Sequence, residues 1–204
     1  MAKNKAPAKG NKSLKELEED IAGTIRGIFG GNKEAKDIKV DEWLTLKKAA
    51  GKIDNLVTRA LTEKFVDWLH QNNMFGDETN PDVLGGILDQ SANANGYDVK
   101  YDYGNVRILA EVKANIPYGK NKYGAEQKKG IKKDLEGLIN GKAKGGVQPA
   151  EIGKYLRFMV ILEVDGARGA MDNLIKNYKY TGKINIVDPK PIAADKINVV
   201  FLKL

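Results

Sequence analysis

The spacing of the apolar residues changes along this chain, and that change limits the folds the chain can adopt. Up to about residue 71, apolar residues recur at helical spacing, which predicts helices over residues 13–29, over residues 41–50 and from Asp54 onward. Gly51 is expected to end the second of these helices, and Asp54 to cap the third. From about residue 84 onward the period changes to two, which is typical of strands with one buried face.

Strands and helices then follow one another to the end of the chain. A tight turn at YGN, residues 103–105, joins two of the strands into a hairpin. This order of elements predicts a mixed α/β (α+β) fold, in which a central mixed β-sheet is flanked by helices. The predicted strands are residues 84–88, 97–103, 106–115, 155–164, 183–187 and 197–203, and the predicted helices are residues 124–140 and 167–178.

The composition excludes several classes of protein. Cysteine is absent, which excludes disulfides and thiolate metal sites and leads us to expect a reducing, cytoplasmic location. His70 is the one histidine, so a metal bound by a single chain would have oxygen ligands. No apolar run approaches the roughly 18 residues of a membrane span, and no membrane association is expected. We expect a flexible basic arm over residues 1–12 and a single domain over residues 13–204.

The chain is also strongly basic. Its 34 Lys and Arg residues outnumber its 27 Asp and Glu residues, for a net charge of +7. A basic chain favours an anionic partner, and nucleic acid is the commonest one. A soluble protein that carries a basic tail is the alternative explanation of the charge.

The apolar strand VRILAEVKAN, residues 106–115, carries two ionisable side chains, Glu111 and Lys113, on one face. Such groups on a half-buried strand are costly unless they are paired, hydrogen-bonded or bound to a metal. The hairpin brings Asp98, on the preceding strand, near Glu111, and two close carboxylates repel each other unless a cation lies between them. The oxygen ligands suit Mg²⁺, and Lys113 could then orient a metal-bound water; an ordinary ion pair is the alternative.

This arrangement resembles the PD-(D/E)xK nuclease superfamily, with Glu111-Val112-Lys113 as the E-x-K element after Asp98 and a short turn. The resemblance implies a restriction-endonuclease-like catalytic core over about residues 54–163. It also implies that Asp98, Glu111 and the backbone carbonyl of Val112 hold Mg²⁺, and that Lys113 serves the attacking water.

The chain departs from the motif of the superfamily at one position. Tyr97, not proline, precedes Asp98. Pro81-Asp82 supplies a literal PD but lies within the predicted loop 71–82, so Asp98 is preferred over Asp82 as the acid of the site.

Two features are similar to Type II restriction endonucleases. Residues 27–49 are similar to the N-terminal region of EcoRI-like enzymes, and lysine-rich loops follow the E-x-K strand. The similarity implies sequence-specific cleavage of double-stranded DNA by a homodimer, because one site cuts one strand and a symmetric partner cuts the other. The candidate DNA-binding residues are Asn115, Lys120, Lys122, Lys142 and Lys144. The alternatives are that Asn115 simply ends its strand and that the lysines are solvated.

Other functions remain open at this point. A structure-specific nuclease of the same superfamily, such as a Holliday-junction resolvase or a repair nuclease, fits the size and charge equally well. A non-catalytic DNA-binding protein with a structural Glu111–Lys113 pair is the alternative from a different class. Glu63 lies opposite the apolar stripe of its helix and is expected to be a solvated glutamate, not an additional acid of the site.

Overall fold

The computed structural model of the protein describes residues 23, 26, 39–75, 96–119, 121–188 and 190–204. The chain divides into two compact units, residues 1–52 and 53–204, and the described β-sheet belongs to the second. The predicted arm 1–12 and the predicted strand 84–88 lie outside the described residues. Of the predicted helix 13–29, Gly23 and Arg26 are described, and both are helical.

The second unit is built around a five-stranded sheet. Its strands are β1 (Val99–Tyr103), β2 (Val106–Lys113), β3 (Leu156–Leu162), β4 (Ile184–Ile186) and β5 (Ile197–Leu202). They lie in the order β1-β2-β3-β5-β4. β1 runs antiparallel to β2, whereas every other neighbouring pair in this sheet is parallel. The predicted mixed sheet is confirmed.

β1 and β2 form the hairpin that the YGN turn predicts. Tyr103 pairs with Val106, so Gly104 and Asn105 make the turn. Gly104 has a φ of 58°, a conformation that glycine adopts without the steric cost that a side chain adds. Because this turn is short and its register is fixed, the far ends of the two strands are also held opposite each other.

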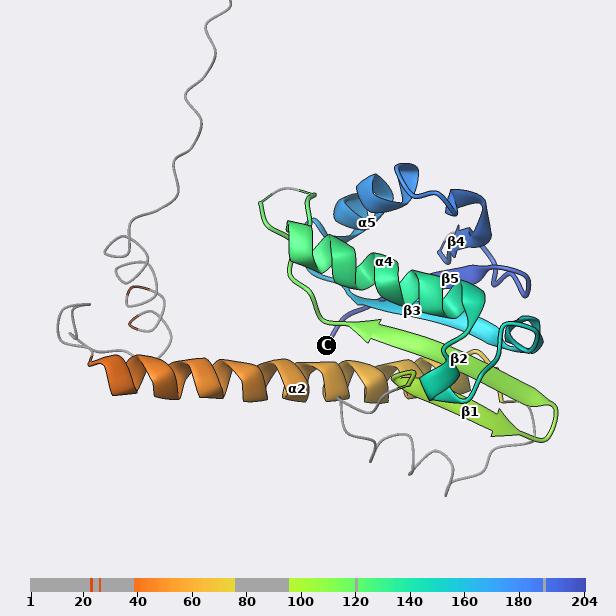
Figure 1. Ribbon diagram of the computed structural model, residues 1–204, viewed down its shortest axis with the longest axis horizontal. Coiled ribbons are helices and arrows are strands. Elements are labelled where there is room, and N and C mark those ends of the chain that lie inside the picture. The colour runs from red at the N-terminus through yellow and green to blue at the C-terminus, as the bar shows by residue number, and fades with distance from the viewer. Residues whose placement is uncertain (1–22, 24–25, 27–38, 76–95, 120, 189) are drawn as a thin grey trace, which may run out of the picture. The chain divides into compact units, whose positions relative to one another are not determined.

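Helices cover both faces of the sheet (Figure 1), which confirms the predicted arrangement of a sheet flanked by helices. On one face lie α4 (Ala125–Asn140) and α5 (Ala167–Lys176), and α4 connects the parallel strands β2 and β3. On the other face lies the C-terminal part of α2 (Val40–Gln71). Short 3₁₀ turns occur at Ala143–Gly145, Ile152–Lys154 and Thr181–Lys183.

Each face of the sheet has its own apolar core. On the α4 side, Ile131, Leu135 and Leu138 pack with strand residues that include Leu109, Met159 and Val199. On the α2 side, Leu61, Phe65 and Leu69 pack with strand residues that include Ile108, Ala110 and Phe158. Alternate residues of β2 and β3 therefore enter opposite cores, as the period of two requires.

The prediction of two separate helices around Gly51 is wrong. α2 runs without interruption for 32 residues, so Gly51 does not end a helix and Asp54 does not cap one. A glycine ends a helix by adopting a left-handed conformation, and Gly51 is not one of the described glycines with positive φ. Glycine inside a helix costs only about 1 kcal/mol relative to alanine, and burial of apolar side chains in later turns of α2 outweighs that cost.

Several element ends also differ from the prediction by one or two residues. β1 begins at Val99 and not at Tyr97. Val99 and Tyr101 pack on the α2 side of the sheet but Tyr97 packs on the α4 side, so the alternation of the strand does not extend back to Tyr97. The Tyr97 hydroxyl donates a hydrogen bond of 3.0 Å to the Gly137 carbonyl oxygen. Among the described residues, no helix is both long and apolar enough to cross a membrane.

Candidate active site

The hairpin register brings Asp98 and Glu111 to the same point of the sheet. Val99 pairs with Ala110, so Asp98, one residue before β1, lies opposite Glu111. Lys113 is the last residue of β2 and follows Glu111 on the same face. The predicted catalytic residues Asp98, Glu111 and Lys113 are therefore neighbours at the carboxyl end of β2.

Asp98 is fixed against the backbone of β2. Its Oδ2 accepts a hydrogen bond of 2.7 Å from the Val112 N–H. Burial raises the pKa of Asp98, although this hydrogen bond and the charge of Lys113 act in the opposite direction. In a strand, the N–H and C=O of one residue point to the same side, so the Val112 carbonyl faces the side of the strand on which Asp98 lies. This direction suits the predicted role of the carbonyl as a metal ligand.

Glu111 is the most deeply buried ionisable group of the site. Its side chain is 4% exposed, and its carboxylate forms an ion pair with the Lys142 ammonium. Burial, followed by repulsion from Asp98 and Asp134, raises the pKa of Glu111 to about 8. Burial alone would lower the pKa of Lys142, but Glu111 and Asp134 outweigh burial and raise it. The carboxylates of this site thus repel one another, and cations relieve that repulsion.

Asp134 is a member of the site that the sequence analysis did not single out. It lies on α4, and its Oδ2 is 2.6 Å from the Lys113 Nζ, while its Oδ1 is 3.2 Å from the Lys142 Nζ. Asp134 borders the apolar stripe of α4, directly before the buried Leu135 and three residues after Ile131. The border of an apolar stripe lies at the edge of the helix face that packs on the sheet, and this position was the one available signal for Asp134.

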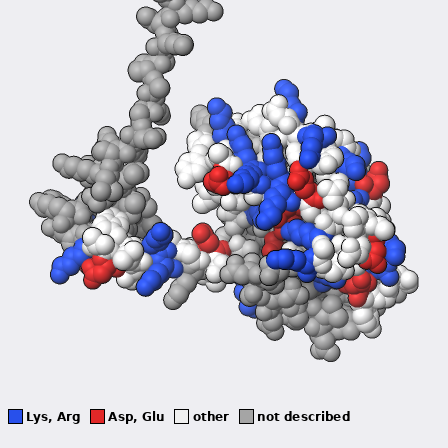
Figure 2. Space-filling view, viewed as in Figure 1, with Lys and Arg blue, Asp and Glu red and all other residues white. Residues whose placement is uncertain are grey.

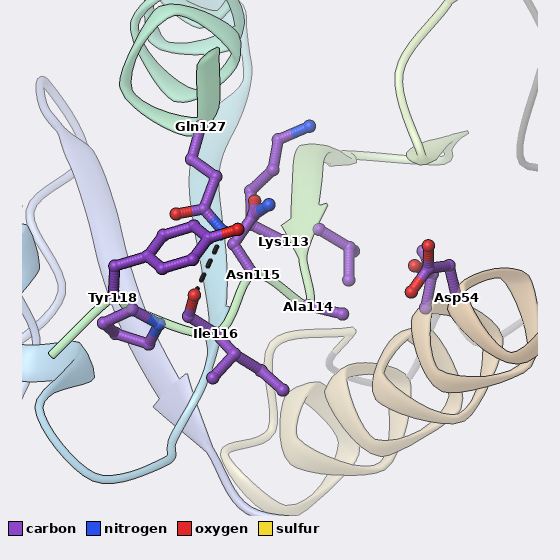
Figure 3. Close-up of a pocket in the computed structure, with 10 residues that line it drawn as sticks. Asp54, Lys113, Ala114, Asn115, Ile116, Tyr118 and Gln127 are labelled. Atoms are coloured by element: carbon purple, nitrogen blue, oxygen red, sulfur yellow. Dashed lines mark hydrogen bonds between the residues drawn. The ribbon is translucent and has the colours of Figure 1, made fainter. Parts of the chain in front are cut away.

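A cleft opens beside these residues at the end of β2 (Figure 3). Its volume is about 590 Å³. Asp54 of α2 lies on one side, and Tyr118 and Gln127 lie on the other. Gln127 holds the wall in place by donating a hydrogen bond of 3.0 Å to the Ile116 carbonyl oxygen and accepting one of 2.9 Å from the Gly124 N–H. The cleft gives a substrate access to Lys113, which is one of its lining residues.

The candidate DNA-binding residues divide into three groups. Asn115 is half-buried and lines the cleft beside Lys113. Lys122 and Lys144 are exposed, while Lys120 lies outside the described residues. Lys142, in contrast, directs its ammonium into the carboxylate cluster and not toward solvent.

Two further acids were considered from the sequence. Glu63 is exposed on α2, where its Oε1 is 3.1 Å from the Arg59 Nε, so it contributes no ligand to the cluster. Asp82 lies outside the described residues.

The surface around the cluster is rich in basic side chains. Figure 2 shows Lys and Arg side chains gathered over α4, with acidic side chains between them. Exposed lysines of α4 are Lys128, Lys129 and Lys133. A surface of this kind attracts an anionic polymer.

The oxygen-rich donors suit a hard cation such as Mg²⁺. In the described part of the chain, no group of three or more His, Cys, Asp or Glu side chains is arranged to hold a metal ion. Lysines lie among the carboxylates instead, since Lys142 contacts both Glu111 and Asp134 and Lys113 contacts Asp134. The donor types fit Mg²⁺, and the cation that contacts Glu111 in this structure is the Lys142 ammonium.

A scan against protein-family models and searches of curated proteins and of solved structures found no match to the chain.

Proposed function

We propose that the protein is a Mg²⁺-dependent endonuclease that hydrolyses phosphodiester bonds of double-stranded DNA, as a homodimeric Type II restriction enzyme. The observation that carries the proposal is the position of Asp98 opposite Glu111, with Lys113 next on the same face of β2. Metal-assisted phosphodiester hydrolysis requires carboxylates, a lysine and access for the substrate, and here the buried Glu111, the partly buried Asp98 and Lys113 lie beside an open cleft.

Each residue has a separate task in this proposal. Asp98, Glu111 and the Val112 carbonyl would hold Mg²⁺, which lowers the pKa of a bound water and stabilises the charge that develops on the phosphate. Lys113 orients the attacking water or stabilises charge on the phosphate. Asp134 positions the Lys113 ammonium through their 2.6 Å contact.

The cleft and the basic surface account for substrate binding in this proposal. Asn115 and Tyr118 line the cleft, where the strand to be cut would approach Lys113. Exposed lysines on α4 and in the loops beside the site would contact backbone phosphates, which adds affinity without reading sequence. A second copy of the chain would supply the site that cuts the opposite strand.

One observation favours a different function. Glu111 is paired with Lys142, and Asp134 is paired with Lys113, so the cluster is also compatible with a purely structural ion-pair network in a DNA-binding protein. Such a protein would bind DNA equally well in Mg²⁺ or chelator and would not cut it.

The test is a digest of long phage DNA by the purified protein in Mg²⁺ or in chelator. We expect discrete fragments in Mg²⁺ alone, since a restriction enzyme cuts at defined sites. Glu111→Ala and Lys113→Ala should abolish cleavage while the folded state is retained. Glu63→Ala is the control, because Glu63 is an exposed acid outside the cluster.

Each other result has its own meaning. A smear of fragments would indicate an unspecific nuclease and not a restriction enzyme. Cleavage of branched DNA alone would support the structure-specific alternative. Bound but uncut linear and branched DNA would overturn the nuclease proposal, as would full activity of Glu111→Ala or Lys113→Ala.

A further inference from the structure

We propose that Lys142 occupies the cation position beside Glu111 in the metal-free protein, and that a divalent cation binds Glu111 only after displacing it. The inference rests on the proposed function, because it takes Glu111 as a metal ligand. The Lys142 ammonium pairs with Glu111 Oε1, lies 3.2 Å from Asp134 Oδ1 and lies 3.4 Å from the Gly96 carbonyl oxygen. Oxygens of three residues therefore surround this one cation.

Lys142 and a divalent cation compete because both need the same carboxylate. An ammonium group in direct contact with Glu111 would lie within a few ångströms of a metal ion on that carboxylate, and the two positive charges repel. Lys113 does not compete with a metal ion for Glu111, because its ion-pair partner is Asp134. Lys142 is therefore the residue whose side chain must move.

The backbone around Lys142 is held independently of this ion pair. The Lys142 carbonyl oxygen accepts a hydrogen bond of 2.8 Å from the Gly145 N–H. The Lys100 ammonium donates one of 3.2 Å to the Gly145 carbonyl oxygen. Gly141, directly before Lys142, has a φ of 80°. Because the loop keeps its shape through these contacts, displacement needs only rotation of the flexible Lys142 side chain.

The aliphatic part of Lys142 is packed against α4. A Cβ added to Gly137 would lie 2.3 Å from Lys142 Cε and 3.0 Å from Lys142 Cγ. The ammonium also lies 5.2 Å from the centroid of the Tyr97 ring. Gly137→Ala should therefore push the Lys142 side chain away from Glu111 without removing its charge. This variant therefore tests whether the position of the Lys142 ammonium matters when its charge is retained.

The experiment measures binding of Mn²⁺, as a substitute for Mg²⁺, to the DNA-free full-length protein by isothermal titration calorimetry. We expect Lys142→Met and Gly137→Ala to bind the ion at least about tenfold more tightly than the wild type, because the competing ammonium is removed or displaced. Lys154→Met is the control, since Lys154 is an exposed lysine outside the cluster, and it should bind the ion as the wild type does. Circular dichroism establishes that each variant is folded.

The outcomes separate the two proposals. Equal or weaker binding in folded Lys142→Met would overturn the inference and leave the nuclease proposal intact. If Lys142→Met does not fold, Gly137→Ala decides by the same criterion. Absence of Mn²⁺ binding in all of these proteins would overturn the metal-dependent function, and the inference with it.

Discussion

Among the described residues, Glu111 has the largest expected effect on how the free energy of unfolding depends on pH. Its pKa is raised to about 8 by burial and then by Asp98 and Asp134, although Lys142 acts in the opposite direction. Folded Glu111 therefore loses its proton, and its ion pair with Lys142 becomes fully charged, at a higher pH than the ordinary value of 4.5 at which the unfolded chain loses the same proton. The free energy of unfolding of the metal-free protein should therefore fall as pH rises from about 4.5 to about 8, by on the order of a few kcal/mol. Burial raises the pKa of Asp98 as well, which adds a contribution of the same sign.

Urea unfolding in chelator, followed by circular dichroism across this pH range, checks this prediction. Glu111→Gln removes the titrating group, so its stability should fall less steeply with pH than that of the wild type. The exposed Glu63→Gln variant should keep the slope of the wild type. An unchanged slope in Glu111→Gln would contradict the raised pKa.

The residues of the site differ in how readily the sequence reveals them. Glu111 and Lys113 stand out because they interrupt an apolar strand, and the turn places Asp98 opposite them through local pairing. Asp134 does not stand out, and Lys142 stands out only as a candidate phosphate contact, because charged residues on a helix and in a glycine-rich loop are usually solvated. Their contacts with the strand depend on how α4 crosses the sheet, which is a tertiary property.

At the level of elements, α2 provides a direct test of the corrected helix boundary. Gly51 lies inside the helix, and a Cβ added there would meet no heavy atom of the described residues within 4 Å. Gly51→Ala should therefore stabilise the protein by about 0.5–1 kcal/mol, because alanine loses less backbone entropy in a helix. The measurement is thermal unfolding by circular dichroism.

The contrasting variant is Gly141→Ala, at the end of α4. Gly141 has a φ of 80°, and a Cβ there would lie 2.7 Å from the Val147 carbonyl oxygen, so this substitution should destabilise the protein. If Gly51→Ala were destabilising to a similar extent, Gly51 would be a helix end, and the sequence-based boundary would be correct after all.

Gly51 and Gly104 show why one prediction was wrong and the other confirmed. The hairpin turn at Gly104 is a local arrangement with a matched pair of strands, so its sequence signal is sufficient. A glycine within a helical pattern can end a helix or be carried through it, and packing decides between the two. In α2, the buried residues after Gly51 belong to the α2-side core, so continuing the helix is the favoured outcome.

At the level of the whole molecule, the positions of the basic residues indicate where the net charge of +7 would attract an anionic partner. Lysines gather over α4, the helix that also supplies Asp134 to the cluster (Figure 2). A DNA strand that follows this surface would pass the candidate site. Binding through phosphates releases counterions, so the logarithm of the association constant should fall linearly with the logarithm of salt concentration.

Fluorescence anisotropy of a labelled DNA duplex in chelator measures this salt dependence without cleavage. Lys144 lies in the loop that Lys100 of β1 holds beside the site, so Lys144→Gln should reduce the magnitude of the slope by about 1. Lys154 is an exposed lysine two residues before β3, whose first residues lie at the end of the sheet away from the carboxyl end of β2, so Lys154→Gln should leave the slope unchanged. Equal effects of the two variants would show that DNA binding is not directed to the site, because charge alone would then explain the affinity.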